Sequence, residues 1–397
     1  LPAAGQGAVY QFDAQNPAAP QAKDRIVAGA RALPCDVTDP EGRVWYDPEG
    51  FAGTATFQFT VRSGQLESPA PATVEIHVTE VPAVPPELTL VAAPAAWGTV
   101  APVDPLPPGV TAPRPRAVLV QATPTPGHSF AGDWVVAAGA ADGLGAGPGA
   151  GTWWIRPRTD ATLLAYFESD NNEDLIAHFK FDGNTVDATA NHSPGVNPEA
   201  AAVPVPDRFG GLRRAYDFDG VRAHIESTVD ISPAAVPNLT MMAWVAPYPP
   251  AEGKPPFRQQ VLSEDDGAFD RSLLIQTGKT WCVFGGPGVD CVETGFDVQQ
   301  PATPAGPDVW QHVAVVYEHG VGLRFCFNGE ERDLQKIPNH DGRSLKLWIG
   351  ESPSPVYHEG YRGRVDDVRV YGRALTAAEI ADFAKNAADP RPQVRIR

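Results

Sequence analysis

Two apolar stretches in the last quarter of the chain alternate with polar residues in the manner of β-strands. The first, WQHVAVVY, covers residues 310–317, and the second, GLRFCFNG, covers residues 322–329. Four residues, 318–321, separate them, which is a suitable length for a tight hairpin connection. The pattern predicts two adjacent antiparallel strands, the second of which ends at an Asn-Gly corner.

One segment near the end of the chain has the pattern of a helix. Thr376 and Glu379 have the spacing of a capping box, and Ile380 and Phe383 supply an apolar stripe. The sequence predicts a helix that starts at Thr376 and ends before the Asp-Pro pair at 389–390. Elsewhere, 42 Pro and 38 Gly indicate many turns and little helix.

The stretch GRVDDVRVYGRALTAAEI at 363–380 extends this pattern. Together with the two strands above, it resembles the second half of a laminin-G-like, or concanavalin A-like, jelly roll. Blocks at 175–183, 214–220 and 239–245 fit the same family, so the resemblance spans residues 175–388. It implies an antiparallel sandwich with one curved face open to a ligand. Members of this family mostly bind rather than catalyse.

Two smaller modules are expected before the jelly roll. Residues 16–79 resemble bacterial cadherin-like and immunoglobulin-like repeats, with alternating apolar positions such as those at 57–61 and 74–78. After a Pro-rich linker, residues 87–167 resemble the small bacterial β-repeat related to the internalin B-repeat. Within that repeat, the Ala- and Gly-rich segment 137–151 predicts a mobile loop.

The expected fold class is therefore all-β and multidomain, with one short C-terminal helix. We place a cadherin- or immunoglobulin-like sandwich at 1–80 and the B-repeat-like module at 87–167. The jelly roll follows at 175–388, and residues 389–397 form a tail.

The charge balance is acidic, with 48 Asp and Glu against 31 Lys and Arg and a net charge of -17. This disfavours nucleic acid and anionic membrane surfaces as partners, because both select a basic footprint. No apolar run approaches the ~20 residues that a membrane-spanning helix requires, so we expect no membrane insertion. The composition suits a secreted protein, and the start at Leu1 without a signal peptide suggests a mature or excised piece of a longer chain.

Four cysteines are too few for a disulfide scaffold. Cys282 and Cys291 flank the turn sequence GGPG at 285–288, so a hairpin could bring them together as a disulfide. Cys35 and Cys326 lie in apolar strand contexts and are predicted to be buried free thiols.

The resemblance implies a structural calcium that joins the first strand of the jelly roll to the last. Its recurring carboxylate corresponds to Asp366, with Asp182, Asp187 and Asn191 as the expected partners. Strict alternation turns Asp366 to the same side as Val368, where a carboxylate requires a partner. The alternative is that Asp366 accepts a hydrogen bond from a loop backbone.

A glycan site requires aromatic platforms together with polar groups. The segment 351–361 and the strand before Cys282 supply candidates, namely Tyr357, His358, Tyr361 and Trp281. The turn at 339–341 is a further candidate. Most aromatic residues of a sandwich fill its core, and we expect this of Trp244, Trp310 and Trp348.

The sequence gives little support for catalysis. It lacks the E-x-D-x-E type of strand that retaining glycanases of this fold carry, and Glu264 to Asp266 have the wrong spacing in a turn-like context. Zinc-type histidine spacing and a Gly-x-Ser-x-Gly elbow are also absent.

The preferred interpretation is a non-catalytic extracellular protein of a bacterial surface, whose calcium-stabilised jelly roll recognises a glycan or a cell-surface or matrix protein in adhesion. A second hypothesis is an accessory region of a secreted polysaccharide-degrading enzyme. A third is a structural subunit of a surface filament or sheath, in which the end segments 1–13 and 391–397 pair between neighbours. The sequence leaves the ligand and the oligomeric state open.

Overall fold

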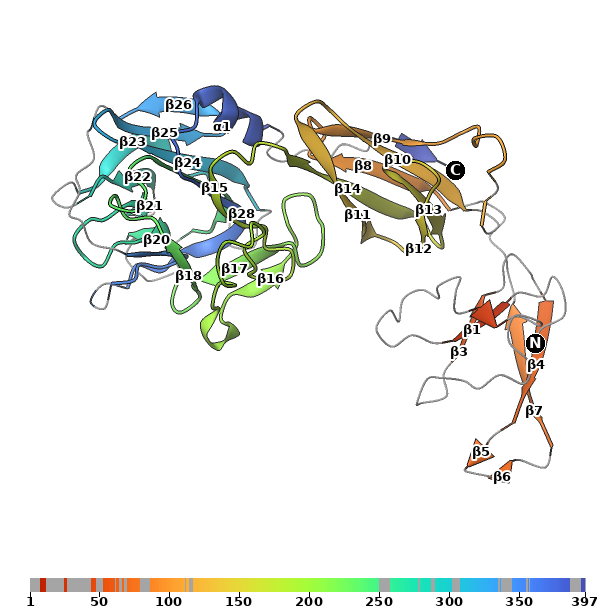
Figure 1. Cartoon of the computed structure of the whole chain (residues 1–397). Helices are drawn as coiled ribbons and strands as arrows, with labels where there is room; N and C mark the ends of the chain where they lie inside the picture. The colour runs from red at the N-terminus through yellow and green to blue at the C-terminus, as the bar shows by residue number, and fades with distance from the viewer. Residues whose placement is uncertain are drawn as a thin grey trace.

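The structure of the chain is a computed structural model. It describes residues 8–11, 25–26, 44–47, 53–60, 62–63, 66–67, 70–78, 86–110, 112–113, 117–249, 258–277, 279–286, 290–301, 308–334, 336, 345–354, 356, 358–385 and 394–396. Within these ranges the regular secondary structure is nearly all β, and a middle module lies between N-terminal strands and a C-terminal sandwich (Figure 1). No helix in the described part is long and apolar enough to span a bilayer.

The N-terminal strands form three small antiparallel sheets. They are β1 (Ala8–Gln11), β2 (Arg25–Ile26) and β3 (Val44–Asp47), then β4 (Gly53–Phe59) with β7 (Ala72–Val78), and β5 (Arg62–Ser63) with β6 (Leu66–Glu67). The pairing of β4 with β7 joins the two alternating segments that the sequence singled out, with Phe57 opposite Val74.

The middle module consists of two four-stranded sheets. One has the order β12-β13-β10-β9, with β9 (Gly98–Pro102), β10 (Val118–Pro124), β12 (Ala141–Ala146) and β13 (Thr152–Pro157). The other has the order β11-β14-β8-β29, with β8 (Leu88–Ala93), β11 (His128–Ala138), β14 (Ala161–Ser169) and β29 (Val394–Ile396). The prediction of a mobile loop at 137–151 was wrong, because β12 pairs with β13 there.

Strand β29 comes from the segment that was expected to be a tail. It pairs antiparallel with β8, which lies about 300 positions earlier in the chain. Figure 1 shows this blue C-terminal strand among the orange strands of the middle module. The last strand of the middle module therefore follows the whole sandwich in the sequence.

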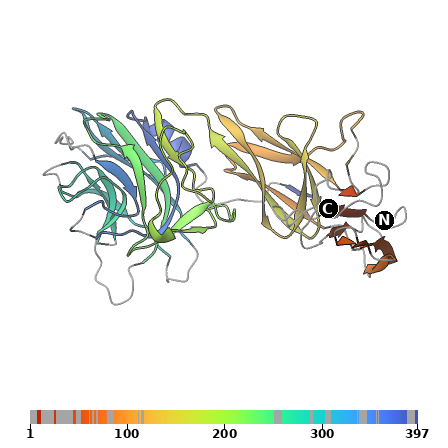
Figure 2. The same cartoon turned by 60° about the horizontal axis from the view of Figure 1, so that its bottom comes forward.

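The C-terminal sandwich contains two facing antiparallel sheets (Figure 2). The first has the order β16-β17-β28-β19-β24-β25-β26, with β15 also paired to β28. Its strands are β15 (Leu175–Phe179), β16 (Val203–Val205), β17 (Ala215–Asp219), β19 (Leu239–Pro247), β24 (Gln311–Glu318), β25 (Gly322–Phe327), β26 (Glu330–Asp333) and β28 (Arg362–Tyr371). A short 3₁₀ turn, η2 (Pro198–Ala200), precedes β16.

The second sheet has the order β18-β27-β20-β21-β22-β23. Its strands are β18 (Ile225–Asp230), β20 (Gln259–Ser263), β21 (Ser272–Gln276), β22 (Thr280–Phe284), β23 (Val292–Asp297) and β27 (Lys346–Ile349). Alternate residues of both sheets, such as Val315 and Val370 from the first and Leu273 and Ile349 from the second, fill one core between them.

The predicted hairpin and its corner are confirmed. Strands β24 and β25 pair from Glu318 opposite Gly322 to Val313 opposite Phe327. The following Asn-Gly corner, Asn328 and Gly329, has positive φ at both residues (49° and 85°), a conformation that these two residue types adopt readily.

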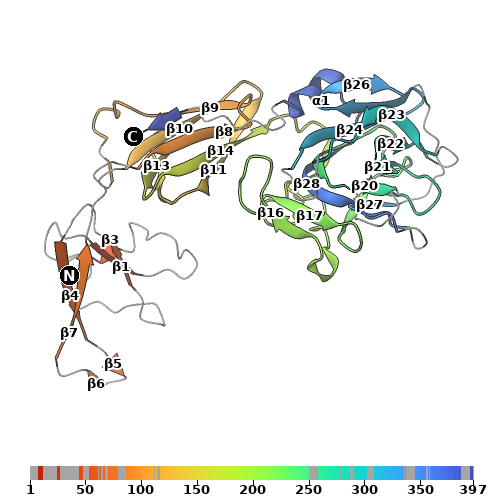
Figure 3. The same ribbon diagram turned by 180° about the vertical axis from the view of Figure 1, so that it is seen from behind.

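The predicted helix is α1 (Ala377–Phe383). Its capping box is present, with Thr376 as N-cap and Glu379 reaching back, and Ile380 and Phe383 are buried. They pack on the outer face of the first sheet, together with Trp97 of the middle module. Figure 3 shows α1 and the middle module on the same side of the sandwich. The second sheet therefore turns its own outer face away from both.

Candidate ligand-binding face

The outer face of the second sheet carries the side chains that alternate with its core residues. In β27, Leu347 and Ile349 enter the core, so Trp348 points outward. In β22, Trp281 and Val283 enter the core, and Cys282 lies on the outer side. A two-residue period thus separates the core face from an outer face. Part of the outer face is also covered, because Leu274, Cys282 and Phe284 form a small buried cluster there.

Trp348 is the aromatic residue that stands out on this face. It is half-buried, and its ring stacks on His224 with centroids 4.7 Å apart and planes 9° from parallel. Nε2 of His224 lies 3.2 Å from Oε1 of Glu226, which is half-exposed at the start of β18. This stack covers one face of the indole. The expectation that Trp348 fills the core was wrong.

On the same side of the second sheet, β20 and the loop before β28 contribute a group of polar side chains, of which Gln260 is 0% exposed. Nε2 of Gln260 donates a hydrogen bond to Oε2 of Glu359 over 2.8 Å. Oε1 of Glu351 accepts from the backbone N–H groups of Ser352 (2.8 Å) and Glu359 (2.7 Å). Burial raises the pKa of both glutamates. Glu351 therefore holds the loop in place, and Glu359 presents an acceptor beside Gln260.

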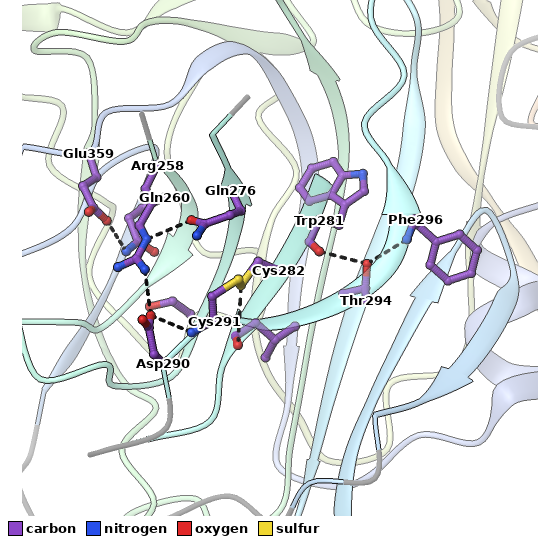
Figure 4. Close-up of a disulfide and its surroundings, with 12 residues drawn as sticks. Arg258, Gln260, Gln276, Trp281, Cys282, Asp290, Cys291, Thr294, Phe296 and Glu359 are labelled. Carbon is purple, nitrogen blue, oxygen red and sulfur yellow. Dashed lines mark hydrogen bonds and ion pairs between the residues drawn. A yellow bond between two sulfur atoms is a disulfide. The ribbon is translucent and has the colours of Figure 1, made fainter. Parts of the chain in front are cut away.

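The far end of the face is held by Arg258 and the disulfide (Figure 4). Nε of Arg258 donates to Oε1 of Gln276 over 2.8 Å, and its NH2 group donates to Oδ1 of Asp290 over 2.7 Å. Cys282 and Cys291 form a disulfide that ties the segment before β23 to β22. We call the group of partly exposed or exposed side chains formed by Trp348, His224, Glu359, Arg258, Gln276 and Asp290 the outer strip.

Of the predicted glycan contacts, two are core residues. Trp281 and Tyr361 are both 0% exposed, and Nε1 of Trp281 donates to Oε1 of Gln311 inside the sandwich. Neither can offer a ring to a surface ligand, which corrects the prediction. His358 is exposed and lies close enough to Glu351 for an electrostatic interaction between the two side chains. Tyr357 and the turn at 339–341 fall outside the described residues.

The predicted calcium carboxylate, Asp366, lies on the opposite face of β28 from the one expected. Where β28 pairs with β19, Met242 lies opposite Arg369 and Trp244 lies opposite Asp366. One residue of β19 but two residues of β28 fall between these pairs, so β28 has an extra residue there. The extra residue produces a β-bulge, in which Asp367 has a φ of 51°. Because the bulge reverses the alternation, Val368 enters the core and Asp366 does not. Oδ2 of Asp366 instead accepts a hydrogen bond from Arg208 over 2.5 Å.

The other predicted ligands also have protein partners, and of these Asp182 lines the same cavity as Asp366. Oδ2 of Asp182 accepts from Arg214 over 2.8 Å, and Nδ2 of Asn191 donates to the carbonyl oxygen of Ile176. Asp187 accepts hydrogen bonds from the backbone N–H groups of His178 and Thr189. No group of three or more His, Cys, Asp or Glu side chains in the described ranges could hold a metal ion. The calcium site remains a prediction, and each of its four residues has a protein hydrogen-bond partner.

Asp366 and Arg208 instead belong to a charged contact between the sandwich and the middle module. A cavity of about 50 Å³ lies there, lined by side chains of both modules. Its volume suits a few water molecules rather than a sugar. Across it, the hydroxyl of Tyr166 donates to Oδ2 of Asp207 over 2.7 Å, and Lys180 pairs with Glu168. The contact joins two modules and does not resemble a ligand site.

Comparison with protein-family models identifies a family that matches the C-terminal sandwich. Residues 219–381 match the family described as the concanavalin A-like lectin/glucanases superfamily. The C-terminal part of the chain therefore has a concanavalin A-like fold, as the sequence predicted. The resemblances assigned to the two preceding modules remain predictions. A search of curated proteins returned no match.

Several solved structures are similar to the chain at low identity. Domain 4 of AbnA, a GH43 extracellular arabinanase from Geobacillus stearothermophilus in complex with arabinotriose, is 17% identical, with a TM-score of 0.38; the match covers 53% of this chain and 98% of that one. A Trypanosoma rangeli sialidase mutant displaying trans-sialidase activity is 17% identical, with a TM-score of 0.39, over 55% and 33% of the two chains. The binding domain of botulinum neurotoxin serotype D is 14% identical, with a TM-score of 0.40, over 54% and 52%.

Proposed function

We propose that the C-terminal sandwich is a non-catalytic carbohydrate-binding module that takes its ligand along the outer strip. The observation that carries this proposal is Trp348, an outward-facing indole held in a fixed orientation by His224. A sugar ring presents an apolar face that packs on such a ring, while its hydroxyls require hydrogen-bonding groups alongside. Glu359 and Arg258, which are partly exposed, supply candidate groups on the same outer face, where Gln260 is 0% exposed and positions Glu359.

The non-catalytic part of the proposal rests on how the acids are used. A glycosidase requires two carboxyl groups free to act as acid and as base or nucleophile. Here Oε1 of Glu351 is bonded to two backbone N–H groups, and Glu351 is only 6% exposed. Its hydrogen bonds stabilise the loop before β28, so Glu351 is not free to act as a catalytic acid or base, and this favours binding over hydrolysis.

The proposed location is outside the cell. The disulfide between Cys282 and Cys291 supports this, because such bonds form and persist in oxidising compartments. The net charge of -17 is compatible with a solvated surface protein and disfavours polyanionic ligands. An adhesion or glycan-recognition role at a cell surface accommodates both features.

The experiment is a glycan-binding screen with the full chain, followed by affinity measurements on variants. Trp348→Ala should weaken binding of a retained glycan at least tenfold, about 1.4 kcal/mol. Trp153→Ala is the matched control, because Trp153 is a half-buried tryptophan of the middle module. Equal affinity of Trp348→Ala and wild type for that glycan would refute the assignment of the outer strip.

A further inference from the structure

Strand β8 of the middle module has a neighbour that arrives from the far end of the chain. Residues 394–396 pair antiparallel with residues 88–90, and β29 is the last strand of its sheet. On its other side β8 pairs in parallel with β14. Without β29, therefore, β8 would be the edge of the sheet.

Strand β8 has none of the usual protections of an edge. Its sequence, LTLVAA, contains no charged residue and no proline, and every residue except Thr89 is buried. Natural edge strands commonly carry Lys, Pro or a bulge that blocks pairing with another chain. An open β8 edge would accept a further strand, so its protection depends on being covered.

We propose that the β8 edge is a strand-acceptor site, filled within one chain by residues 394–396 and open to the same segment of a second copy. The exchange would link copies of the protein by β-strand addition. It goes beyond glycan recognition and does not depend on it, because the acceptor lies in the middle module.

The length of the pairing sets the conditions under which exchange occurs. Three residue pairs join β29 to β8. Before a strand of a second copy can bind, the hydrogen bonds of this short ladder have to break. A tethered strand competes with an effective concentration on the order of 1 mM. The closed monomer should dominate in dilute solution, and exchange should become frequent as the protein concentration approaches that value.

The test uses Thr89 and Arg395, which lie directly opposite each other. In full-length chains that also carry Cys35→Ser, one sample carries Thr89→Cys and the other Arg395→Cys. The two are mixed and oxidised at concentrations from about 1 µM to about 1 mM, the range set by the effective concentration. A covalent heterodimer should form, and its fraction should rise at least tenfold across the range. The double variant Thr89→Cys/Arg395→Cys, diluted to the lowest concentration, should instead form a disulfide within one chain.

A second variant separates strand exchange from random collision. Adding Val394→Pro/Ile396→Pro to the Arg395→Cys chain removes ladder donors and should abolish the heterodimer. The proposal is overturned if the heterodimer persists with these prolines or forms at no concentration. Failure of the double variant to close within one chain would also overturn it. Because no glycan enters this assay, its result is independent of the proposed binding function.

Discussion

Trp348 and His224 form a parallel ring stack, 4.7 Å between centroids, on the outer face of the second sheet. Trp281 lies two strands beyond β20 in the same sheet, but it faces the opposite way and is 0% exposed. Two tryptophans of one sheet thus have different environments, one on the outer face and one in the core.

Replacing these two tryptophans should therefore separate binding from stability. Trp281→Ala should lower the free energy of unfolding by about 3–5 kcal/mol, because it leaves a cavity in a closed core. Trp348→Ala should lower it by about 1 kcal/mol or less, as expected of an outward side chain. Chemical denaturation of both variants measures the difference. A loss of stability in Trp348→Ala as large as that in Trp281→Ala would mean that the indole is structural.

The pairing of Asp366 with Arg208 predicts the response to metal removal. Because a guanidinium already neutralises this carboxylate, adding calcium or a chelator should leave the melting temperature of the sandwich unchanged. Asp366→Ala should cost less than the ~3–5 kcal/mol of a fully orphaned buried charge, because Arg208 keeps its longer ion pair with Asp367 at 3.9 Å. Thermal unfolding with calcium and with excess chelator checks both statements.

The matched variant for this pair is Asp366→Ala/Arg208→Ala. Removing both charges should recover part of the stability lost in Asp366→Ala, because no unpaired charge is left. A calcium-dependent rise in melting temperature that Asp366→Ala abolishes would restore the predicted metal site.

Glu264 predicts a pH dependence of stability. Burial raises the pKa of Glu264 to about 8, and within the described residues its Oε2 has no hydrogen-bond partner. The folded state therefore binds a proton more tightly than the unfolded state. The resulting stabilisation is complete below about pH 4.5 and is lost as the pH rises toward 8.

The variant Glu264→Gln isolates this contribution. Between pH 4.5 and pH 7 wild type should lose up to about 3 kcal/mol relative to Glu264→Gln, which keeps the shape but does not titrate. Urea unfolding at a series of pH values gives the two curves. Parallel curves over this range would show that the carboxyl group titrates normally.

The hydrogen bond from Tyr166 to Asp207 predicts how firmly the middle module docks on the sandwich. Tyr166→Phe removes the donor but keeps the ring, which packs against Phe209. We expect a loss of about 1 kcal/mol and faster proteolysis at the joint between the modules. Thr162→Ser, in the same strand but away from the joint, is the control. Unchanged proteolysis in Tyr166→Phe would indicate that the apolar contact alone holds the modules.

Local patterns were sufficient for several elements of this protein. The hairpin of β24 and β25, the N-cap of α1 at Thr376 and the proximity of Cys282 and Cys291 depend on residues close in sequence. In each case the interacting residues lie within about fifteen positions of one another, so a short stretch of sequence contains all the parts of the interaction. The concanavalin A-like fold followed from a run of such elements in a recognisable order.

The tertiary structure decided which side of each strand faces the core. In the run Lys346 to Ile349 an apolar neighbour lies on either side of Trp348, so the alternation does not reveal that the indole points outward. The bulge at Asp367, which moves Asp366 out of the predicted position, depends on pairing with β19.

The sequence by itself therefore determined the strands, their period and the class of fold. The phase of each strand, and the distant partner that β29 finds on β8, are set by contacts between segments up to about 300 residues apart. Such contacts form only when the whole chain has folded, because no local preference specifies which of several apolar edges a short strand will meet.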